Sequence, residues 1–127
     1  MTTVVAAIIQ RADRILIGRR TGSQPHPLKW EFPGGKVEPG ETPEHALARE
    51  LREELAIEAK IGPEVERYEF IYPGKKPILL IFLRVDTFTG EPQNLIFQEI
   101  AWVAHRQLPG YDFLEGDVDF VKRLTAS

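Results

Sequence analysis

The sequence predicts an α+β fold in which two helices pack against a mixed β-sheet. Short apolar runs recur along the chain between glycine, proline and polar residues, at lengths typical of strands. One longer stretch after Glu41 is amphipathic with clear helix-start signals, and a shorter helical stretch ends at Leu124. Each helix must bury its apolar stripe against another element, so this mixture favours helices layered on a sheet.

The N-terminal part of the chain is expected to form strands and one loop. Thr3 to Ile9 and Arg14 to Ile17 are predicted strands joined by a polar turn. Gly22 to Pro27 is rich in glycine, serine and proline, which predicts a loop. Trp30-Glu31-Phe32 is then predicted to end a strand, because Pro33-Gly34-Gly35 interrupts it.

The stretch after Glu41 has the features of an amphipathic helix. Thr42 is a suitable N-cap, and Pro43 suits the first helical position. An apolar stripe that must face a core recurs every four residues, at Leu47, Leu51 and Leu55.

The C-terminal half of the chain is predicted to contain three more strands and a short helix. Glu64 to Tyr72 and Ile78 to Val85 flank a turn at Pro73 to Lys76. The second of these strands is apolar on both faces, as expected for a strand covered on both sides. Glu99 to Ala104 is a further strand, and Asp117 to Leu124 is the short helix.

Three carboxylates in the predicted helix point to a metal site. Glu50, Glu53 and Glu54 stand at i, i+3 and i+4, so they share one face of the helix. Like charges at this spacing repel one another, but such a cluster also offers the oxygen ligands that Mg²⁺ prefers. The alternative is an ordinary solvent-facing helix with ion pairs, such as Arg49 with Glu53.

The residues around this helix resemble a known motif. The chain from Gly35 to Ile57 is similar to the Nudix box, a pattern carried here by Gly35, Glu41, Arg49, Glu50, Leu51, Glu53, Glu54 and Ile57. The preceding Trp30 to Lys36 resembles the MutT-type branch of nucleotide pyrophosphohydrolases. One position departs, because Ala56 stands where the box usually has a glycine that helps the chain leave the helix.

The resemblance implies a Nudix-type α/β/α sandwich with a Mg²⁺ site, in which Mn²⁺ is a possible substitute. The expected ligands are the carboxylates Glu50, Glu53 and Glu54 and the backbone carbonyl of Gly34 or Gly35. Glu99 is a further candidate, either as a metal ligand or as a proton acceptor for water. The alternative for Glu99 is a surface carboxylate.

Several residues near the glycines are candidate substrate contacts by the same resemblance. Arg20 matches a position near the phosphates, and its alternative is an exposed charge at a strand edge. Phe32 matches a position that lines the base pocket, where its ring can stack on a base, although spacing alone favours a core residue. The flanking Glu31, Pro33 and Gly34 complete this expected substrate-binding segment.

Base selectivity is expected to come from the segment before the last helix. MutT-like enzymes place an Asn or Asp there, within an Ala-Asp/Asn-x-Pro pattern that is absent from this chain. Glu115 is the candidate here, with Asp117 as the alternative, since either carboxylate can accept a hydrogen bond from a base edge. Asp117 is also a suitable N-cap for the last helix.

The composition narrows the class of protein. At 127 residues, 43% of them hydrophobic and 28% charged, the chain is expected to form one domain over residues 1–127. Its net charge of −3 argues against a surface for polymeric nucleic acid, and the absence of cysteine excludes disulfide and thiol chemistry. No secretory signal or membrane span is recognisable, so the cytoplasm is the expected location.

The resemblance therefore implies a Mg²⁺-dependent enzyme that cleaves a nucleoside triphosphate to a monophosphate and pyrophosphate, as a monomer or homodimer. The leading specific substrate is 8-oxo-dGTP, and the alternatives are CTP, 5-methyl-dCTP and ADP-ribose. An alternative of another class is a non-catalytic Nudix-like nucleotide sensor. Such modules typically lose box carboxylates, whereas this chain keeps Glu50, Glu53 and Glu54.

Overall fold

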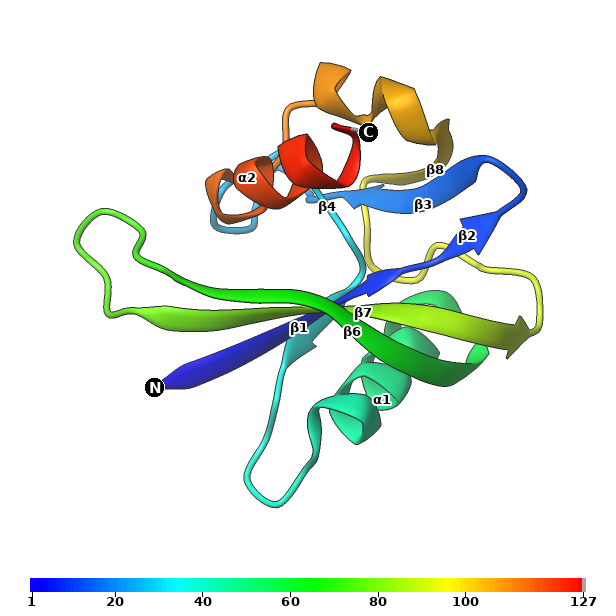
Figure 1. The fold of residues 1–127 in the computed structure, drawn as a ribbon, viewed down its shortest axis with the longest axis horizontal. Helices are drawn as coiled ribbons and strands as arrows, with labels where there is room; N and C mark the ends of the chain where they lie inside the picture. Colours follow the sequence, from blue (N-terminus) through cyan, green and yellow to red (C-terminus); the bar gives the residue numbers. More distant parts are fainter. Residues whose placement is uncertain (127) are drawn as a thin grey trace.

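Two four-stranded sheets and two α-helices make up the computed structural model, which describes residues 1–126 (Figure 1). The first sheet has the order β5-β1-β7-β6, in which β1 and β7 are parallel and the other pairs antiparallel. Its strands are β5 (Gly34–Lys36), β1 (Thr2–Ile8), β7 (Ile78–Thr89) and β6 (Glu58–Phe70). Among the described residues, no helix is long and apolar enough to cross a membrane.

The second sheet is built around one central strand. It contains β2 (Gln10–Arg11), β3 (Arg14–Arg19), β4 (Trp30–Glu31) and β8 (Glu99–Ala104), and β3 pairs antiparallel with each of the others. The helices are α1 (Pro43–Leu55), α2 (Glu115–Leu124) and a short 3₁₀ helix, η1 (His105–Gly110).

The two α-helices cover opposite faces of the first sheet (Figure 1), which confirms the α/β/α sandwich predicted from the sequence. Successive side chains of a strand point to opposite faces. Val5 and Ala7 of β1 therefore pack with the leucine stripe of α1, whereas Ala6 and Ile8 pack on the side of Phe120 in α2. The apolar character of β1 and β7 on both faces follows from this double cover.

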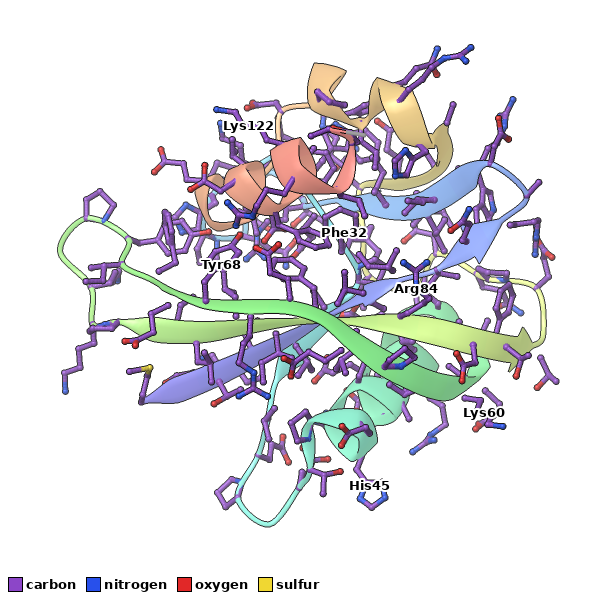
Figure 2. The ribbon with its side chains drawn as sticks, in the orientation of Figure 1. Phe32, His45, Lys60, Tyr68, Arg84 and Lys122 are labelled. Carbon is purple, nitrogen blue, oxygen red and sulfur yellow. The ribbon has the colours of Figure 1, made fainter. Side chains whose placement is uncertain are left out.

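Aromatic rings fill the core on the α2 side. The Phe82 and Phe120 rings stack with their centroids 3.9 Å apart. Phe32 lies between the first sheet and α2, where its ring stacks on that of Phe113 with centroids 5.2 Å apart (Figure 2). These rings connect the loop after β4 to the last helix, so the loop and the helix share the core on this side of the sheet.

Helix α1 begins and ends as its sequence predicts. The Thr42 hydroxyl accepts a hydrogen bond from the His45 backbone N–H at 3.1 Å, and Pro43 occupies the first turn. Ala56 adopts the left-handed conformation, with φ 56°, and its N–H bonds to the Arg52 carbonyl. Ala56 thus takes the backbone conformation that glycine usually adopts at helix ends, which costs about 1 kcal/mol of folding free energy. The chain therefore leaves α1 in the same way as it would with glycine at this position.

Strand β6 begins at Glu58 rather than at the predicted Glu64. The strand continues through Gly62 and Pro63, because the pairing with β7 shifts register on both sides of them. These bulges leave Pro63 outside the ladder, where its missing N–H costs nothing.

Two further elements differ from the sequence-based expectation. Gly34–Lys36 pairs with β1 as strand β5, although the glycines predicted only a break. Helix α2 begins at Glu115 with Leu114 at the N-cap, so the prediction of Asp117 as the N-cap is wrong. Asp117 lies within the first turn, and its side chain is buried.

We expect Phe82→Ala to lower the free energy of unfolding by about 3–5 kcal/mol, because it empties the centre of the aromatic core. Urea denaturation followed by circular dichroism measures this change. The control is Val65→Ala on β6, where the side chain is 38% exposed, and it should change stability by less than about 0.5 kcal/mol. Equal losses in the two variants would contradict the described packing.

Candidate active site

A cleft of about 280 Å³ lies where α1, β1, the glycine strand β5 and the start of α2 meet. Charged side chains from different parts of the chain line it, among them Arg20, Glu31, Glu54 and Asp117. Apolar side chains make up much of the remaining wall, including Phe32, Ile78, Leu80 and Leu114. A concave, partly apolar site with a few converging polar groups is typical of a small-molecule site.

Glu54 is the most buried carboxylate of the predicted metal triplet. Its residue is 8% exposed, and its Oε1 accepts a hydrogen bond from the Gly34 backbone N–H at 3.1 Å. Burial, together with the neighbouring carboxylates of Glu31 and Glu50, raises the pKa of Glu54 to about 9. The site therefore has more negative charge than its own hydrogen bonds balance.

Arg49 holds the other carboxylates of the helix and the loop before it. Its guanidinium contacts Glu41 at 2.8 Å, Glu50 at 2.7 Å and Glu53 at 3.3 Å, and donates to the Lys36 carbonyl at 3.2 Å. The hydrogen bond from Arg49 lowers the pKa of Glu41 to about 2. Arg49 and Glu41 thus join the loop to α1.

The two glycines of β5 allow the backbone to approach its neighbours closely. A Cβ on Gly34 would lie 1.9 Å from the Val5 carbonyl oxygen. A Cβ on Gly35 would lie 2.6 Å from the Glu50 carboxyl group. Only glycine fits at these positions, so the backbone of β5 lies directly beside the carboxylates of α1.

The donor set fits a hard divalent cation, although the ligands are not gathered into a finished cage. Within residues 1–126, no three His, Asp or Glu side chains converge as a ready-made metal centre. The Glu50 carboxylate faces Arg49, and the Glu53 side chain is 57% exposed. Glu54, beside Glu31 and Glu50, supplies buried oxygen ligands and uncompensated charge, and Mg²⁺ commonly completes its shell with water.

The predicted substrate-binding segment lies at this cleft. Arg20, Glu31, Phe32 and Gly34 all line it. Arg20 is not an exposed edge charge, because its side chain is 19% exposed and pairs with Glu31 at 3.1 Å. Pro33 is buried outside the lining, and its carbonyl accepts a hydrogen bond from the Ala7 N–H at 2.8 Å.

Five predicted site residues lie outside the cleft lining: Glu50, Glu53, Pro33, Glu99 and Glu115. The Glu99 side chain is 53% exposed and pairs with Arg19 at 3.4 Å. Glu115 is exposed at the first position of α2. The carboxylate of this segment that does line the cleft belongs to Asp117, the alternative to Glu115.

Asp117 is 6% exposed, and burial raises its pKa to about 8, with Glu31 adding to the effect. The helical periodicity of the sequence could have predicted that Asp117 points inward. Asp117 stands three and four residues before the buried Phe120 and Val121, so it shares their inward face.

The cleft also includes residues that the sequence analysis did not select. Lys36 follows the two glycines directly, and Tyr72 and His26 come from loops distant in the sequence. The position of Lys36 next to the glycines could have indicated from the sequence that it lies at the site. The meeting of His26 with Tyr72 depends on the fold and has no local signal.

Comparison with known proteins relates nearly the whole chain to one family. The family model described as the NUDIX domain matches residues 1–124. The chain is 37% identical to the CTP pyrophosphohydrolase of Escherichia coli K12, over 99% of this chain and 93% of that protein. It is 39% identical to an 8-oxo-dGTP diphosphatase of Haemophilus influenzae, over 95% and 89% of the respective chains.

A solved structure has the same fold. The solution structure of the E. coli ORF135 protein superimposes with a TM-score of 0.88 at 37% identity, covering 99% of this chain and 89% of that one. The sandwich fold thus occurs in that protein as well as here. This protein belongs to the Nudix hydrolase family.

Proposed function

We propose that this Nudix hydrolase is a Mg²⁺-dependent pyrophosphohydrolase that cleaves a nucleoside triphosphate to a nucleoside monophosphate and pyrophosphate. The observation that carries the proposal is the buried Glu54 carboxylate, which lies against the Gly34 N–H and beside Glu31 and Glu50 at the cleft. An excess of buried carboxylate with no cationic partner of its own suits a site that receives a cation with its substrate.

The proposed ligands are Glu50, Glu53, Glu54 and the backbone carbonyl of Gly34 or Gly35. A divalent cation, when bound, neutralises the charge of the phosphate oxygens and lowers the pKa of an attacking water. Nudix hydrolases generally use divalent metal ions, and we propose Mg²⁺ for this chain, with Mn²⁺ as a substitute. Glu99 stays a further candidate, either as a metal ligand or as a proton acceptor for water; in this structure its carboxylate pairs with Arg19 outside the cleft lining.

The surrounding residues position these groups. The Gly34 N–H fixes one oxygen of Glu54, and Arg49 fixes the carboxylate of Glu50. Glu54 is the main candidate to accept a proton from water once a cation replaces the proton that its own carboxyl group holds, because it is the carboxylate of the helix triplet that lines the cleft.

The proposed place for the base is the end of the cleft formed by α2. Asp117 lines that end and can exchange hydrogen bonds with a base edge. The leading substrate is 8-oxo-dGTP, which the H. influenzae relative is named for. The second candidate is CTP or 5-methyl-dCTP, because the E. coli relative named for CTP matches nearly the whole chain.

We also propose that the substrate is a small molecule rather than polymeric nucleic acid, in agreement with the net charge of −3. The cytoplasm is the proposed location, with the protein acting as a monomer or homodimer.

A hydrolysis panel tests the proposed reaction. It contains 8-oxo-dGTP, dGTP, CTP, 5-methyl-dCTP, ADP-ribose and diadenosine polyphosphates, each assayed with Mg²⁺ and with a chelator. Metal-dependent release of pyrophosphate from a nucleoside triphosphate is the expected result, and the highest kcat/KM identifies the substrate. Tight nucleotide binding without any turnover would contradict the proposal and favour a sensor.

Glu54→Gln is expected to lower kcat at least about a hundredfold, because the amide keeps the shape and the Gly34 contact but neither binds a cation as strongly nor accepts a proton. The matched control is Glu44→Gln, an exposed position in the first turn of the same helix, and its activity should equal that of the wild type. Steady-state kinetics on the best substrate measures both. Near-normal kcat in Glu54→Gln would contradict the assigned role.

The stability of the cation-free protein is expected to fall as the pH rises. The pKa of Glu54 is raised to about 9 and that of Asp117 to about 8, so the folded protein holds protons that the unfolded chain releases above its ordinary carboxyl pKa values. Their stabilising contribution is complete below those ordinary values and is lost as the pH passes the raised ones.

We therefore expect the Tm measured with chelator to decrease between about pH 5 and pH 9, and Mg²⁺ to raise the Tm most at the alkaline end. Differential scanning fluorimetry across this range measures both effects. Glu54→Gln should show a weaker pH dependence and a smaller response to Mg²⁺. A Mg²⁺ effect that is the same at every pH would contradict the expected linkage.

A further inference from the structure

Two aromatic rings from distant segments meet on one wall of the cleft. His26 lies in the loop between β3 and β4, and Tyr72 lies two residues after the end of β6. Their ring centroids are 4.7 Å apart, with the planes tilted by 40°, and both residues line the cleft. His26 is exposed and Tyr72 half-buried, so the pair extends from the interior of the site to its mouth.

Tyr72 is fixed to the helix that carries Asp117. Its hydroxyl accepts a hydrogen bond from the Gly116 N–H at 3.0 Å, and its ring packs edge-on against Phe70, with centroids 4.8 Å apart. A Cβ on Gly116 would lie 2.8 Å from the Tyr72 hydroxyl oxygen, so the glycine makes room for it. Tyr72 is therefore a rigid wall next to the buried Asp117.

His26 is held by a loop whose conformation is costly. It has φ 54°, in the left-handed region, and lies between Pro25 and Pro27. The Arg20 Nε donates to the Pro25 carbonyl at 2.7 Å, while another nitrogen of Arg20 pairs with Glu31 inside the cleft. Left-handed backbone at a non-glycine residue persists where surrounding contacts enforce it, and such residues cluster at ligand sites.

The acidic part and the aromatic part of the cleft are supplied by different elements. The carboxylate of Glu54 comes from α1 with the glycines of β5, whereas Tyr72 and Asp117 are joined through α2, on the opposite face of the sheet (Figure 1). Phosphates and a cation suit the first group, and a planar, apolar heterocycle suits the second.

We propose that the His26–Tyr72 pair is the surface on which the base of the nucleotide stacks, and that His26 is a specificity-determining residue for base-containing substrates. This inference rests on the proposed function and specifies how that same site retains its substrate. Stacking on an aromatic face accepts any nucleobase, because every base has a π-face. The wall thus distinguishes a nucleotide from a sugar phosphate, while hydrogen-bonding groups such as Asp117 distinguish the bases.

The test compares variants of two neighbouring residues that share the left-handed conformation. Asn adopts this conformation readily, so His26→Asn removes the aromatic ring while preserving the loop. His26→Phe restores an aromatic ring. The matched control is Leu28→Asn, since Leu28 also has a positive φ, of 62°, but does not line the cleft.

Binding of CMP, 8-oxo-dGMP and ribose 5-phosphate to each full-length variant is measured by calorimetry with Mg²⁺ present, together with kcat and KM for the best triphosphate. We expect His26→Asn to weaken monophosphate binding about tenfold and to raise KM with little change in kcat. His26→Asn should bind ribose 5-phosphate as the wild type does and have the same Tm. His26→Phe and Leu28→Asn should match the wild type in binding, kcat and KM.

Unchanged nucleotide binding in His26→Asn would overturn the proposal that the base stacks on the His26–Tyr72 pair. An equal loss of affinity for ribose 5-phosphate would overturn it as well. Wild-type protein that binds the monophosphates but hydrolyses no triphosphate would overturn the proposed reaction, and the binding series would still decide the role of His26. Wild-type protein that binds none of the monophosphates would overturn both.

Discussion

Burial of the Glu54 carboxylate is the constraint on which the rest of this structure depends. A carboxylate with little access to water costs free energy unless hydrogen bonds or opposite charges offset the lost hydration. Here the protein supplies one backbone N–H, from Gly34, and surrounds the group with the carboxylates of Glu31 and Glu50. Either a proton or a cation must supply the missing positive charge, and this choice links the stability of the fold to occupancy of the site.

The apolar packing of the sandwich holds the carboxylate in place against this cost. Leu51 and Leu55 flank Glu54 on α1 and are fully buried against the sheet, so the helix cannot rotate the carboxylate into solvent without exposing them. Strand β5 pairs with β1, which also pairs with β7, and this ladder places the Gly34 N–H at the cleft. Strain and charge repulsion concentrated at a site, and offset by the core elsewhere, are typical of active sites.

Local signals in the sequence predicted the helix and its carboxylates, because capping, apolar periodicity and spacing act over a few residues. The sandwich was implied by the resemblance to the Nudix box, and the apolar faces of β1 and β7 agree with it. Tertiary contacts decided the rest. Pairing with β7 carried β6 through Gly62 and Pro63, and the earlier start of α2 turned Asp117 rather than Glu115 into the cleft. The pairing of Glu99 with Arg19 likewise depends on strand register, which no local pattern shows.

The most direct test of the central claim is a crystal structure of the protein soaked with Mn²⁺, with the ion located by its anomalous scattering. The account predicts an ion bound to the Glu54 carboxylate, with further oxygen ligands from Glu50, Glu53 or the backbone of β5. It also predicts that the ion disappears in Glu54→Gln crystals soaked in the same way. An ion held elsewhere while the cleft carboxylates stay free, or an ion that persists in Glu54→Gln, would contradict it.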